Sequence, residues 1–340
     1  MNILAIDTSC DETAVAVTRN TKACSNVVWS QASLHAKFGG VMPSLAQRQH
    51  EERIDYVLNK ALGKKYQNLK NIDAIAVTIG PGLSIALGVG INKAKELAIK
   101  YKLPLIPINH VEAHLLSPFV NSDTNIQFPA LGLVLSGGTT MLCLIKNIGN
   151  YEILAETGDD ALGEALDKAA RFLGLGYPGG AILEKLAKAG NPKKYKLPIP
   201  LINDINKNRF SYSGLKTAFV RFFNTIKKPT KQDISDLAST FQEVAFKHVE
   251  NVLEYQINHS SLTFKHLLLG GGVANNIVLK SKLRKLLKNY NISLCVPNNK
   301  KLNGDNAGMI GVCAYLKYNS SNLEQFVNYD SIDRNPKFRI

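Results

Sequence analysis

The chain has 340 residues, of which 45% are hydrophobic and 20% charged, a composition typical of a globular protein with room for two lobes. No apolar run reaches the roughly 18–20 residues that span a bilayer, and the first residues read as a strand, so we expect a cytoplasmic protein with no membrane association. Five scattered cysteines, none in a C-x-x-C pair, argue against a disulfide scaffold and a zinc ribbon.

The net charge of +14 points to a polyanionic partner. Basic residues cluster at 193–196, 227–231 and 280–288. Lysine and arginine that neutralise phosphates release counterions and so strengthen binding to nucleic acid. Solvated lysine faces have the same composition, so charge alone leaves a nucleic-acid partner open.

The first half of the chain is predicted to begin with a β-hairpin. Its strands are expected at residues 2–7 and 13–18, around a tight polar turn at 8–12. Helices and strands then alternate up to His110: a helix over 43–62, a strand at 73–79, a turn at Gly80-Pro81-Gly82, a helix to about 99 and a strand at 103–108.

The same pattern restarts near Pro129 with strands at 131–135 and 141–146 around Ser136-Gly137-Gly138. The remaining predicted elements are helices at 162–173, 181–189, 213–226 and 234–259, a strand at 267–269 ending in Gly270-Gly271-Gly272, a helix from about 274, a strand at 292–296 and a helix from 305.

This repetition predicts a duplicated α/β fold with two lobes and a cleft between them. A polar stretch at 121–127 reads as the boundary. We therefore expect an N-terminal lobe at 1–125, a C-terminal lobe with a helical insertion at 126–325, and a tail at 326–340.

Three small turns are candidates for holding phosphate or a nucleotide: 8–12, 136–138 and 270–272. Glycine lets backbone amides approach an anion, and a following helix adds a favourable dipole. Such turns also commonly connect strands and helices without binding any ligand. The sequence has neither a P-loop nor a dinucleotide-binding fingerprint.

His110 and His114 are the sharpest local signal. Four residues apart on a helix, they lie about 40° apart around its axis and can bind one metal ion. Asp305, in the second half of the chain, is the expected third ligand. A zinc peptidase would place its catalytic acid directly after the first histidine, whereas Glu112 lies about 200° away and is expected to point off the metal face.

Two further stretches stand out. Gly163 and Asp167 share one helical face, and Asp167 is either a contact to ribose hydroxyls or an amine, or a surface acid. The run 210–217 is either an RNA- or substrate-contacting turn, or the capped start of a helix.

Taken in order, ten strings resemble one family. They are 5–13 (AIDTSCDET), 43–50 (PSLAQRQH), Gly80-Pro81-Gly82, His110-x-x-x-His114, Ser136-Gly137-Gly138, 163–168 (GEALDK), Tyr177-Pro178-Gly179-Gly180, 210–217 (FSYSGLKT), Gly271-Gly272-Val273 and Asp305-Asn306. The chain resembles the TsaD/Gcp family of tRNA-modifying enzymes over about residues 2–318, and the string at 43–50 resembles its bacterial and organellar branch.

The resemblance implies an actin/Hsp70-like (ASKHA) fold and transfer of a threonylcarbamoyl group from threonylcarbamoyl-AMP to N6 of adenosine 37, in tRNAs that read codons beginning with A. It implies one divalent metal ion, Fe²⁺ or Zn²⁺, on His110, His114 and Asp305, with the nucleotide (threonylcarbamoyl-AMP or ATP) in the cleft. The substrate contacts that it implies are Val134, Leu135, Ser136, Gly137, Gly138, Asp167, Gly180, Glu184, Gly271, Gly272 and Asn276.

Asp11 and Glu12 at the first turn are either catalytic carboxylates or residues that only order the loop. The resemblance further implies a TsaB-like paralogous subunit, a TsaE-like P-loop ATPase and tRNA as partners. Three positions depart from the family pattern: Thr139 stands where bacterial members often have His, Val134 where the archaeal branch has a Tyr ligand, and Asn303-Gly304 where Cys-Thr is usual.

Other functions remain open. A small-molecule kinase on the same fold would use the two hairpins and a glycine turn for ATP without needing the histidine pair. A non-catalytic RNA- or protein-binding module would explain the charge but leave the histidine pair and Asp305 without a role. A metallopeptidase is disfavoured by the position of Glu112.

Overall fold

The computed structural model describes residues 1–204, 207–318, 326 and 328–340 of the chain, which forms two compact units. The first unit contains Met1–Asn125 and Val296–Ile340, and the second contains Ile126–Cys295. The sequence predicts that residues 126–325 form the second lobe, but the segment from Val296 onward belongs to the first unit. The reason is that the chain leaves the second sheet after its last strand and returns to pack on the first.

The first unit is built on a five-stranded sheet in the order β3-β2-β1-β4-β5. The predicted hairpin is present, because β1 (Asn2–Asp7) pairs antiparallel with β2 (Glu12–Arg19), and β1 also pairs parallel with β4 (Ala74–Gly80). β3 (Lys22–Ser30) continues the antiparallel ribbon, and β5 (Leu105–Asn109) lies parallel to β4.

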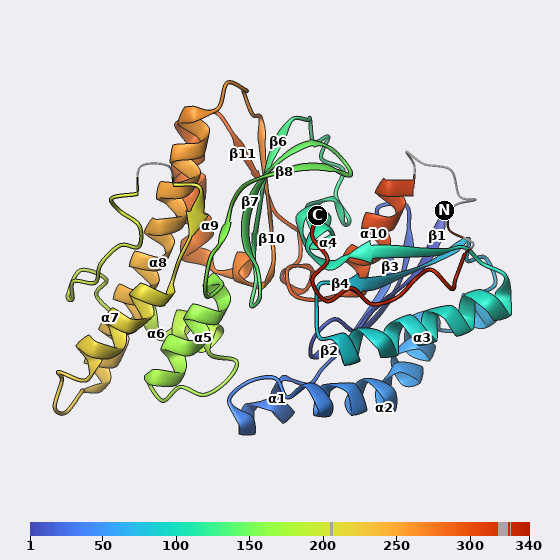
Figure 1. The fold of residues 1–340 in the computed structure, drawn as a ribbon, viewed down its shortest axis with the longest axis horizontal. Coiled ribbons are helices and arrows are strands. Elements are labelled where there is room, and N and C mark those ends of the chain that lie inside the picture. The colour runs from blue at the N-terminus through green and yellow to red at the C-terminus, as the bar shows by residue number, and fades with distance from the viewer. Residues whose placement is uncertain (205–206, 319–325, 327) are drawn as a thin grey trace. The chain divides into compact units, whose positions relative to one another are not determined.

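Helices cover both faces of this sheet (Figure 1). α2 (Pro43–Leu62), with proline in its first turn, and α3 (Ser84–Tyr101) pack on the face that carries Leu4 and Ile6. α10 (Ala307–Tyr318) packs on the other face, where a Cβ on its Gly311 would lie 3.2 Å from the Cβ of Ala5. The strand alternation therefore builds two core layers. The shorter helices are α1 (Ala32–His35) and α4 (His110–Leu116), with 3-10 turns at Ala36–Phe38, Gln67–Leu69, Ser117–Phe119 and Lys300–Leu302.

Residues 328–340, here called the C-terminal strap, cross the ends of β4 and β5. The Asn335 amide donates to the Ile79 carbonyl at 2.7 Å, and the Asn109 side-chain amide donates to the Phe338 carbonyl at 3.1 Å. Gly80 has φ +156°, and a Cβ on it would lie only 1.8 Å from the Asn335 carbonyl oxygen. The strap therefore requires glycine at this position.

The second unit repeats the topology of the first. Its sheet has the order β11-β10-β6-β7-β8-β9, so the strands β8-β7-β6-β10-β11 correspond in order to β3-β2-β1-β4-β5. β6 (Ala130–Leu135) pairs antiparallel with β7 (Thr140–Asn147) and parallel with β10 (His266–Gly270). The other strands are β8 (Asn150–Thr157), β9 (Arg209–Phe210) and β11 (Ser293–Cys295). The repeat confirms the predicted duplication.

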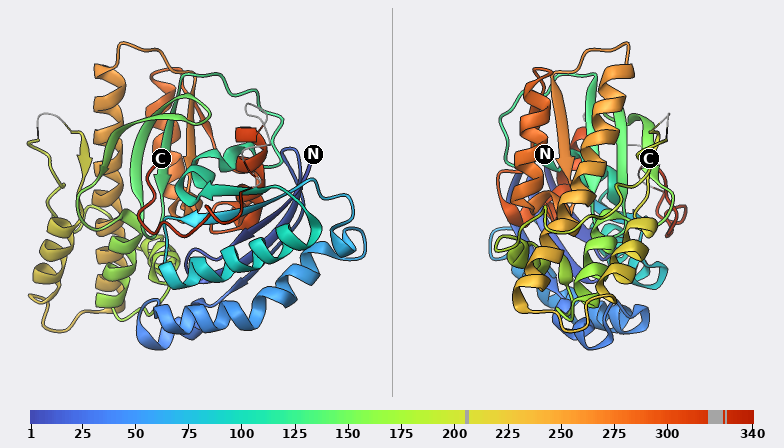
Figure 2. Two further views of the ribbon diagram at one scale, coloured as in Figure 1. Left: turned by 45° about the vertical axis from the view of Figure 1, so that its right-hand side comes forward. Right: turned by 90° about the vertical axis from the view of Figure 1, so that its left-hand side faces the viewer.

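The helices of the second unit lie around the long α8 (Lys231–His259). α8 contacts α5 (Leu162–Phe172), α6 (Gly179–Ala187) and α9 (Ile277–Lys288), and these helices lie together in both views of Figure 2. Phe219 of α7 (Ser213–Phe223) stacks edge-on against Phe241 of α8 with ring centroids 5.0 Å apart. Thr230 and Asp233 form a capping box at the start of α8. A 3-10 turn at Gly272–Asn275 precedes α9. Among the described residues, no helix has the length and apolarity to cross a membrane.

Candidate functional site

A short helix, α4, carries the two predicted histidine ligands. Asn109 ends β5 and caps α4, because its Oδ1 accepts from the amides of Val111 and Glu112 at 2.8 and 3.1 Å. The same residue therefore ends a strand, starts a helix and holds the C-terminal strap. His110 and His114 follow on one face of the helix, as the spacing predicts.

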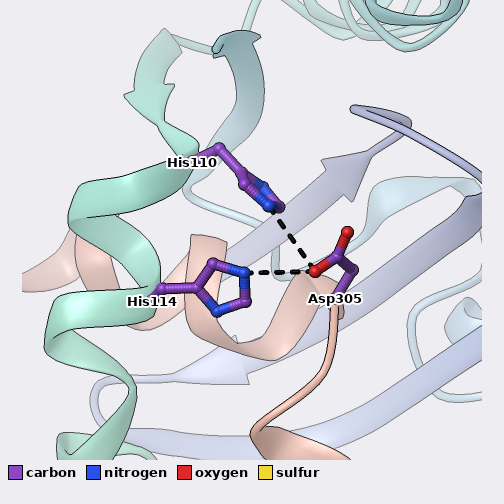
Figure 3. Close-up of side chains that lie close together, drawn as sticks. All are labelled: His110, His114 and Asp305. Atoms are coloured by element: carbon purple, nitrogen blue, oxygen red, sulfur yellow. Dashed lines mark hydrogen bonds and ion pairs between the residues drawn. The ribbon is translucent and has the colours of Figure 1, made fainter. Parts of the chain in front are cut away.

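Both imidazoles face Asp305 (Figure 3). Asp305 Oδ1 lies 3.1 Å from Nε2 of His114 and 3.6 Å from Nε2 of His110, and one ligand atom from each residue lies within 4.8 Å of the others. The predicted convergence of the three residues is confirmed. All three belong to the first unit. The expectation that Asp305 reaches the histidines from the C-terminal lobe, predicted at 126–325, is therefore wrong.

The outer nitrogen of His110 is held by Asp7 and Ser9, which the sequence did not connect with the histidine pair. Its Nδ1 lies 3.4 Å from Oδ2 of Asp7 and 3.2 Å from Oγ of Ser9. A carboxylate on the outer nitrogen fixes the tautomer and aims the other nitrogen at an ion. This arrangement and the donor set of two imidazoles and a carboxylate fit a divalent transition metal. Asp7 ends β1 within the string 5–13, and an acid at the end of a buried strand was the available signal.

The charges of the cluster favour an ion pair when no metal competes. Burial works to lower the pKa of His110, but the carboxylates of Asp7 and Asp305 outweigh it and hold that pKa well above its usual value. The pKa of Asp305 is lowered despite burial, because His110 and His114 face its carboxylate. A metal ion at this site would therefore compete with a proton for His110.

The first turn places Cys10 and Glu12 in the electrostatic field of Asp305. Burial, followed by the charges of Asp305 and Asp11, raises the pKa of Glu12 well above its usual value, and Ser30 Oγ donates to Glu12 Oε1 at 3.0 Å. Burial is also the main cause that raises the pKa of the Cys10 thiol. Asp11, which lies between Cys10 and Glu12, is also buried, with 8% of its surface exposed.

Glu112 points away from the histidine pair, as predicted. Its side chain is buried and pairs with Lys317 Nζ of α10 at 2.8 Å. The pair ties the helix of the histidines to the helix that follows Asp305. A carboxylate committed to this ion pair cannot activate water at the cluster, which argues against a metallopeptidase.

In the second unit, the structure brings the two predicted glycine turns together. β6 ends at Leu135 and runs into 136–138, while β10 runs alongside it into Gly271, which has φ +94°. A Cβ on Gly271 would lie 2.3 Å from the Leu135 carbonyl oxygen, so only glycine allows this approach. Gly137, Gly138 and Gly272 are exposed, and a Cβ on any of them would meet no atom of the described residues within 4 Å, which leaves their backbone open to a ligand. Val134 and Leu135 are fully buried in the strand.

The helices α5 and α6 meet at the predicted Asp167. Asp167 Oδ1 accepts from the Gly180 amide at 2.7 Å, and Gly163 packs so closely on the 136–138 turn that a Cβ would lie 2.5 Å from the Ser136 carbonyl oxygen. Asp167 is half-buried. The carboxylate is thus fixed within the same group of turns.

Glu184 and Asn276 meet at the start of α9. Glu184 Oε1 accepts from the Ile277 amide at 3.0 Å, and Asn276 Oδ1 accepts from the Leu279 amide at 3.0 Å. Asn276 also donates to Gln242 at 2.9 Å and is 6% exposed. Both side chains stabilise the helix start that follows Gly272.

The run 210–217 is anchored by two acids of the preceding loop. Asp159 accepts from the hydroxyls of Ser211 and Ser213 at 2.5 and 2.6 Å, and Asp160 pairs with Lys216. No side chain of the run caps α7 at its first residue. These contacts attach the start of α7 to Asp159 and Asp160, which explains why the run contains hydroxyl and basic residues.

The sequence matches the family TsaD, described as tRNA N6-adenosine threonylcarbamoyltransferase, over residues 22–312. A protein of that name from Trichlorobacter lovleyi is 44% identical over 323 residues, which cover 93% of this chain and 92% of the relative. Another from Persephonella marina is 43% identical over 329 residues, covering 94% and 91%.

Among solved structures, HypF from T. kodakarensis aligns with a TM-score of 0.61 and 15% identity, over 96% of this chain and 49% of HypF. A ROK family protein from Streptococcus pneumoniae aligns with a TM-score of 0.51 and 13% identity, over 94% and 99%. At this identity the likeness concerns the fold alone, and it confirms the predicted ASKHA fold. The sequence matches establish the family, and the chain belongs to the tRNA N6-adenosine threonylcarbamoyltransferases.

Proposed function

We propose that this chain transfers the threonylcarbamoyl group of threonylcarbamoyl-AMP to N6 of adenosine 37 in tRNAs that read ANN codons, and releases AMP. Identity of 40–44% over 93% of the chain to proteins named for this transfer supports the reaction. The observation that carries its chemistry is the convergence of His110, His114 and Asp305. The protein is then a cytoplasmic acyltransferase of t6A biosynthesis.

His110, His114 and Asp305 would hold one divalent ion, Fe²⁺ in the first place and Zn²⁺ as the alternative. Two imidazoles and one carboxylate are the protein ligands of many Fe²⁺ sites and also of catalytic zinc. When bound, the ion supplies positive charge that stabilises the oxyanion developing on the carbamoyl carbonyl. Asp7 and Ser9 keep the His110 ring aimed at Asp305.

The second unit supplies the nucleotide-binding residues of this proposal. The turns at Ser136-Gly137-Gly138 and Gly271-Gly272, in which Gly137, Gly138 and Gly272 are exposed, offer backbone amides to the phosphate of AMP. Asp167 accepts from the ribose or the threonine amine. Val134, Leu135 and Gly180 shape the backbone, and Glu184 and Asn276 support the helix start beside Gly272.

In the transfer, the adenine N6 forms a bond to the carbamoyl carbon while the bond from that carbon to the phosphate oxygen of AMP breaks. The N6 proton must be accepted, and Asp11 and Glu12 are the proposed acceptors. The raised pKa of Glu12 makes its carboxylate a stronger base than an ordinary carboxylate. Positioning and charge stabilisation are expected to supply most of the rate.

We infer the same partners that the resemblance implies: tRNA as substrate, a TsaB-like subunit and a TsaE-like P-loop ATPase. The test is reconstitution of the purified chain with these two subunits, threonine, bicarbonate, ATP, a threonylcarbamoyl-AMP synthase and unmodified tRNA, followed by mass spectrometry of the nucleosides. The wild type should form the modified adenosine, and His110→Ala/His114→Ala should not. His259→Ala, at an exposed histidine of α8, is the matched control. Full modification by the metal-free double variant would refute the proposed role of the cluster.

A further inference from the structure

Two segments of the second unit contain basic residues and no acid. Residues 185–196 and 221–232 together hold nine lysines and arginines, and neither segment contains Asp or Glu. Lysine runs are often solvated faces with no partner. What distinguishes these two runs is their placement in the fold.

The structure joins the two segments at the start of α8. Tyr195 of the first segment donates its hydroxyl to Asp233 Oδ1 at 2.6 Å, and its ring lies against Phe222 with centroids 5.0 Å apart. The Asn191 amide donates to Asp236 Oδ1 at 2.7 Å, and Gln232 Nε2 donates to the Ala189 carbonyl at 3.1 Å. Charges about 35 residues apart in sequence therefore share one surface.

The acids at this junction are already engaged. Lys194 Nζ lies 3.2 Å from Asp236 and 3.6 Å from Asp233, and both carboxylates also accept the hydrogen bonds that join the segments. The lysines around them are exposed, and in the described part of the chain they have no acid within 4 Å. We name them the α8 lysine surface: Lys193, Lys196, Lys227, Lys228 and Lys231.

The first basic segment begins on α6, which also carries part of the proposed nucleotide site. α6 contains Gly180 and Glu184 and ends at Ala187, ahead of Lys193 in the chain, and it packs along α8 (Figure 1). A long polyanion bound on the lysines would thus lie on the segment that follows α6, the helix whose Gly180 amide donates to Asp167 of α5.

We propose that the α8 lysine surface binds the phosphate backbone of tRNA. The inference rests on the proposed function, which supplies tRNA as the polyanion. Unpaired exposed lysines attract phosphates without reading sequence, which suits an enzyme that acts on several tRNAs. The surface contributes affinity and orientation and takes no part in the transfer itself.

The test compares the wild type with a variant in which all five lysines of the surface are replaced by glutamine. Binding of a fluorescein-labelled, unmodified transcript of an ANN-reading tRNA is measured by anisotropy from about 50 to about 300 mM salt, a range that resolves the salt slope. The variant should bind roughly tenfold or more weakly near 0.1 M salt, and its salt slope should fall by about one for each lysine that contacts a phosphate.

A second variant controls for net charge. It replaces five exposed lysines of the first unit by glutamine and loses the same charge: Lys22, Lys37, Lys64, Lys70 and Lys100. Equal losses in both variants, an unchanged slope in the first, or no salt-dependent binding by the wild type would each overturn the proposal. The five-lysine variant is also tested for binding to an acidic peptide and to anionic vesicles. If it bound tRNA as tightly as the wild type but had lost binding to either of these, the proposal would also be overturned, because the partner of the surface would be another molecule.

The two proposals fail differently. A wild type that binds tRNA through the surface but forms no modified adenosine contradicts the proposed function and leaves the surface standing. Modification with an unchanged salt slope in the five-lysine variant contradicts the surface alone. Melting temperatures of both variants should match the wild type, because all ten side chains are exposed.

Discussion

The carboxylate of Asp7 shows how one buried residue prepares another. It is 1% exposed, its Oδ1 accepts from the Ser9 amide at 3.1 Å, and its Oδ2 faces the outer nitrogen of His110. A charge buried this deeply is retained only where it has a partner. His110 is that partner, and the metal would bind the opposite side of the same ring.

Replacing Asp7 by Asn should therefore weaken metal binding while leaving all three ligands in place. An amide has the same shape but does not hold the imidazole proton with a charge, and such outer partners are worth about 10- to 100-fold in affinity. Calorimetric titration of the apoprotein with Zn²⁺ and anaerobic Fe²⁺ measures the effect. Asp123→Asn, at an exposed acid of the same unit, is the control, and equal affinities in the two variants would contradict the role of Asp7.

His248 predicts a dependence of stability on pH. Its Nε2 accepts from the Ser211 amide at 3.2 Å, so the ring must be neutral on that side, and burial followed by the charge of Lys207 lowers its pKa to about 4. At pH values well above the usual histidine pKa of about 6.5, the ring is neutral in both the folded and the unfolded protein. Between pH of about 6.5 and about 4 the unfolded chain takes up the proton first, so the free energy of unfolding falls as the pH falls.

The expected loss between pH of about 7.5 and about 5 is about 2 kcal/mol from this residue. Urea unfolding at the two pH values measures it. In His248→Gln, the glutamine oxygen accepts the same hydrogen bond without titrating, so the variant should lose that much less stability on acidification. An identical pH dependence in both proteins would rule out His248 as its source.

At the scale of elements, the C-terminal strap governs the edge where the site lies. It bonds to Ile79 at the end of β4 and to Asn109 at the start of α4, and Gly80 lies directly beneath it. The segment adds no regular secondary structure, yet it closes the edge next to the histidine helix.

Gly80→Ala should destabilise the protein by about 2 kcal/mol or more, because the added methyl group would overlap the Asn335 carbonyl and alanine is strained at this φ. Chemical denaturation measures the change. Gly40→Ala is the matched control, since it has an unstrained φ and no atom of the described residues within 4 Å of the added group. A loss no larger than that of the control would show that the strap does not press on Gly80.

Elements with strong local signals were predictable from the sequence. α2 begins at Pro43 and ends at Leu62 as its proline start and helical period indicate, and the i, i+4 spacing located the two histidines of the cluster. β3 and β8 were not predicted, because their faces are partly exposed and their alternation is irregular. The strap and the Asp7–His110 contact depend on pairings about 100 residues or more apart, which no local pattern encodes.

At the scale of the whole molecule, two units of the same strand order have different roles in our proposals. The first holds the metal ligands, and the second offers the glycine turns and the lysine surface. The carboxylate ligand follows the last strand of the second unit in sequence but folds with the first.

Metal removal should therefore act on one unit. At a free metal concentration about 1,000 times the dissociation constant, the ion stabilises the folded state by about 4 kcal/mol. After treatment with a chelator, hydrogen exchange should quicken at the amides of α4 and of the Asp305–α10 segment, while α8 stays protected. The Asp305→Ala variant should not respond to the chelator, and equal acceleration in both units would contradict a local site.

The interruption of the first unit by residues 126–295 has a consequence for biosynthesis. During translation, the second imidazole leaves the ribosome 191 residues before the carboxylate that completes the cluster. A nascent chain can expose the histidine pair for most of its synthesis without having a full coordination sphere. Stable binding of the proposed ion would thus be a late event, open only to chains that have been synthesised past Asp305, and prematurely terminated chains would be left without it.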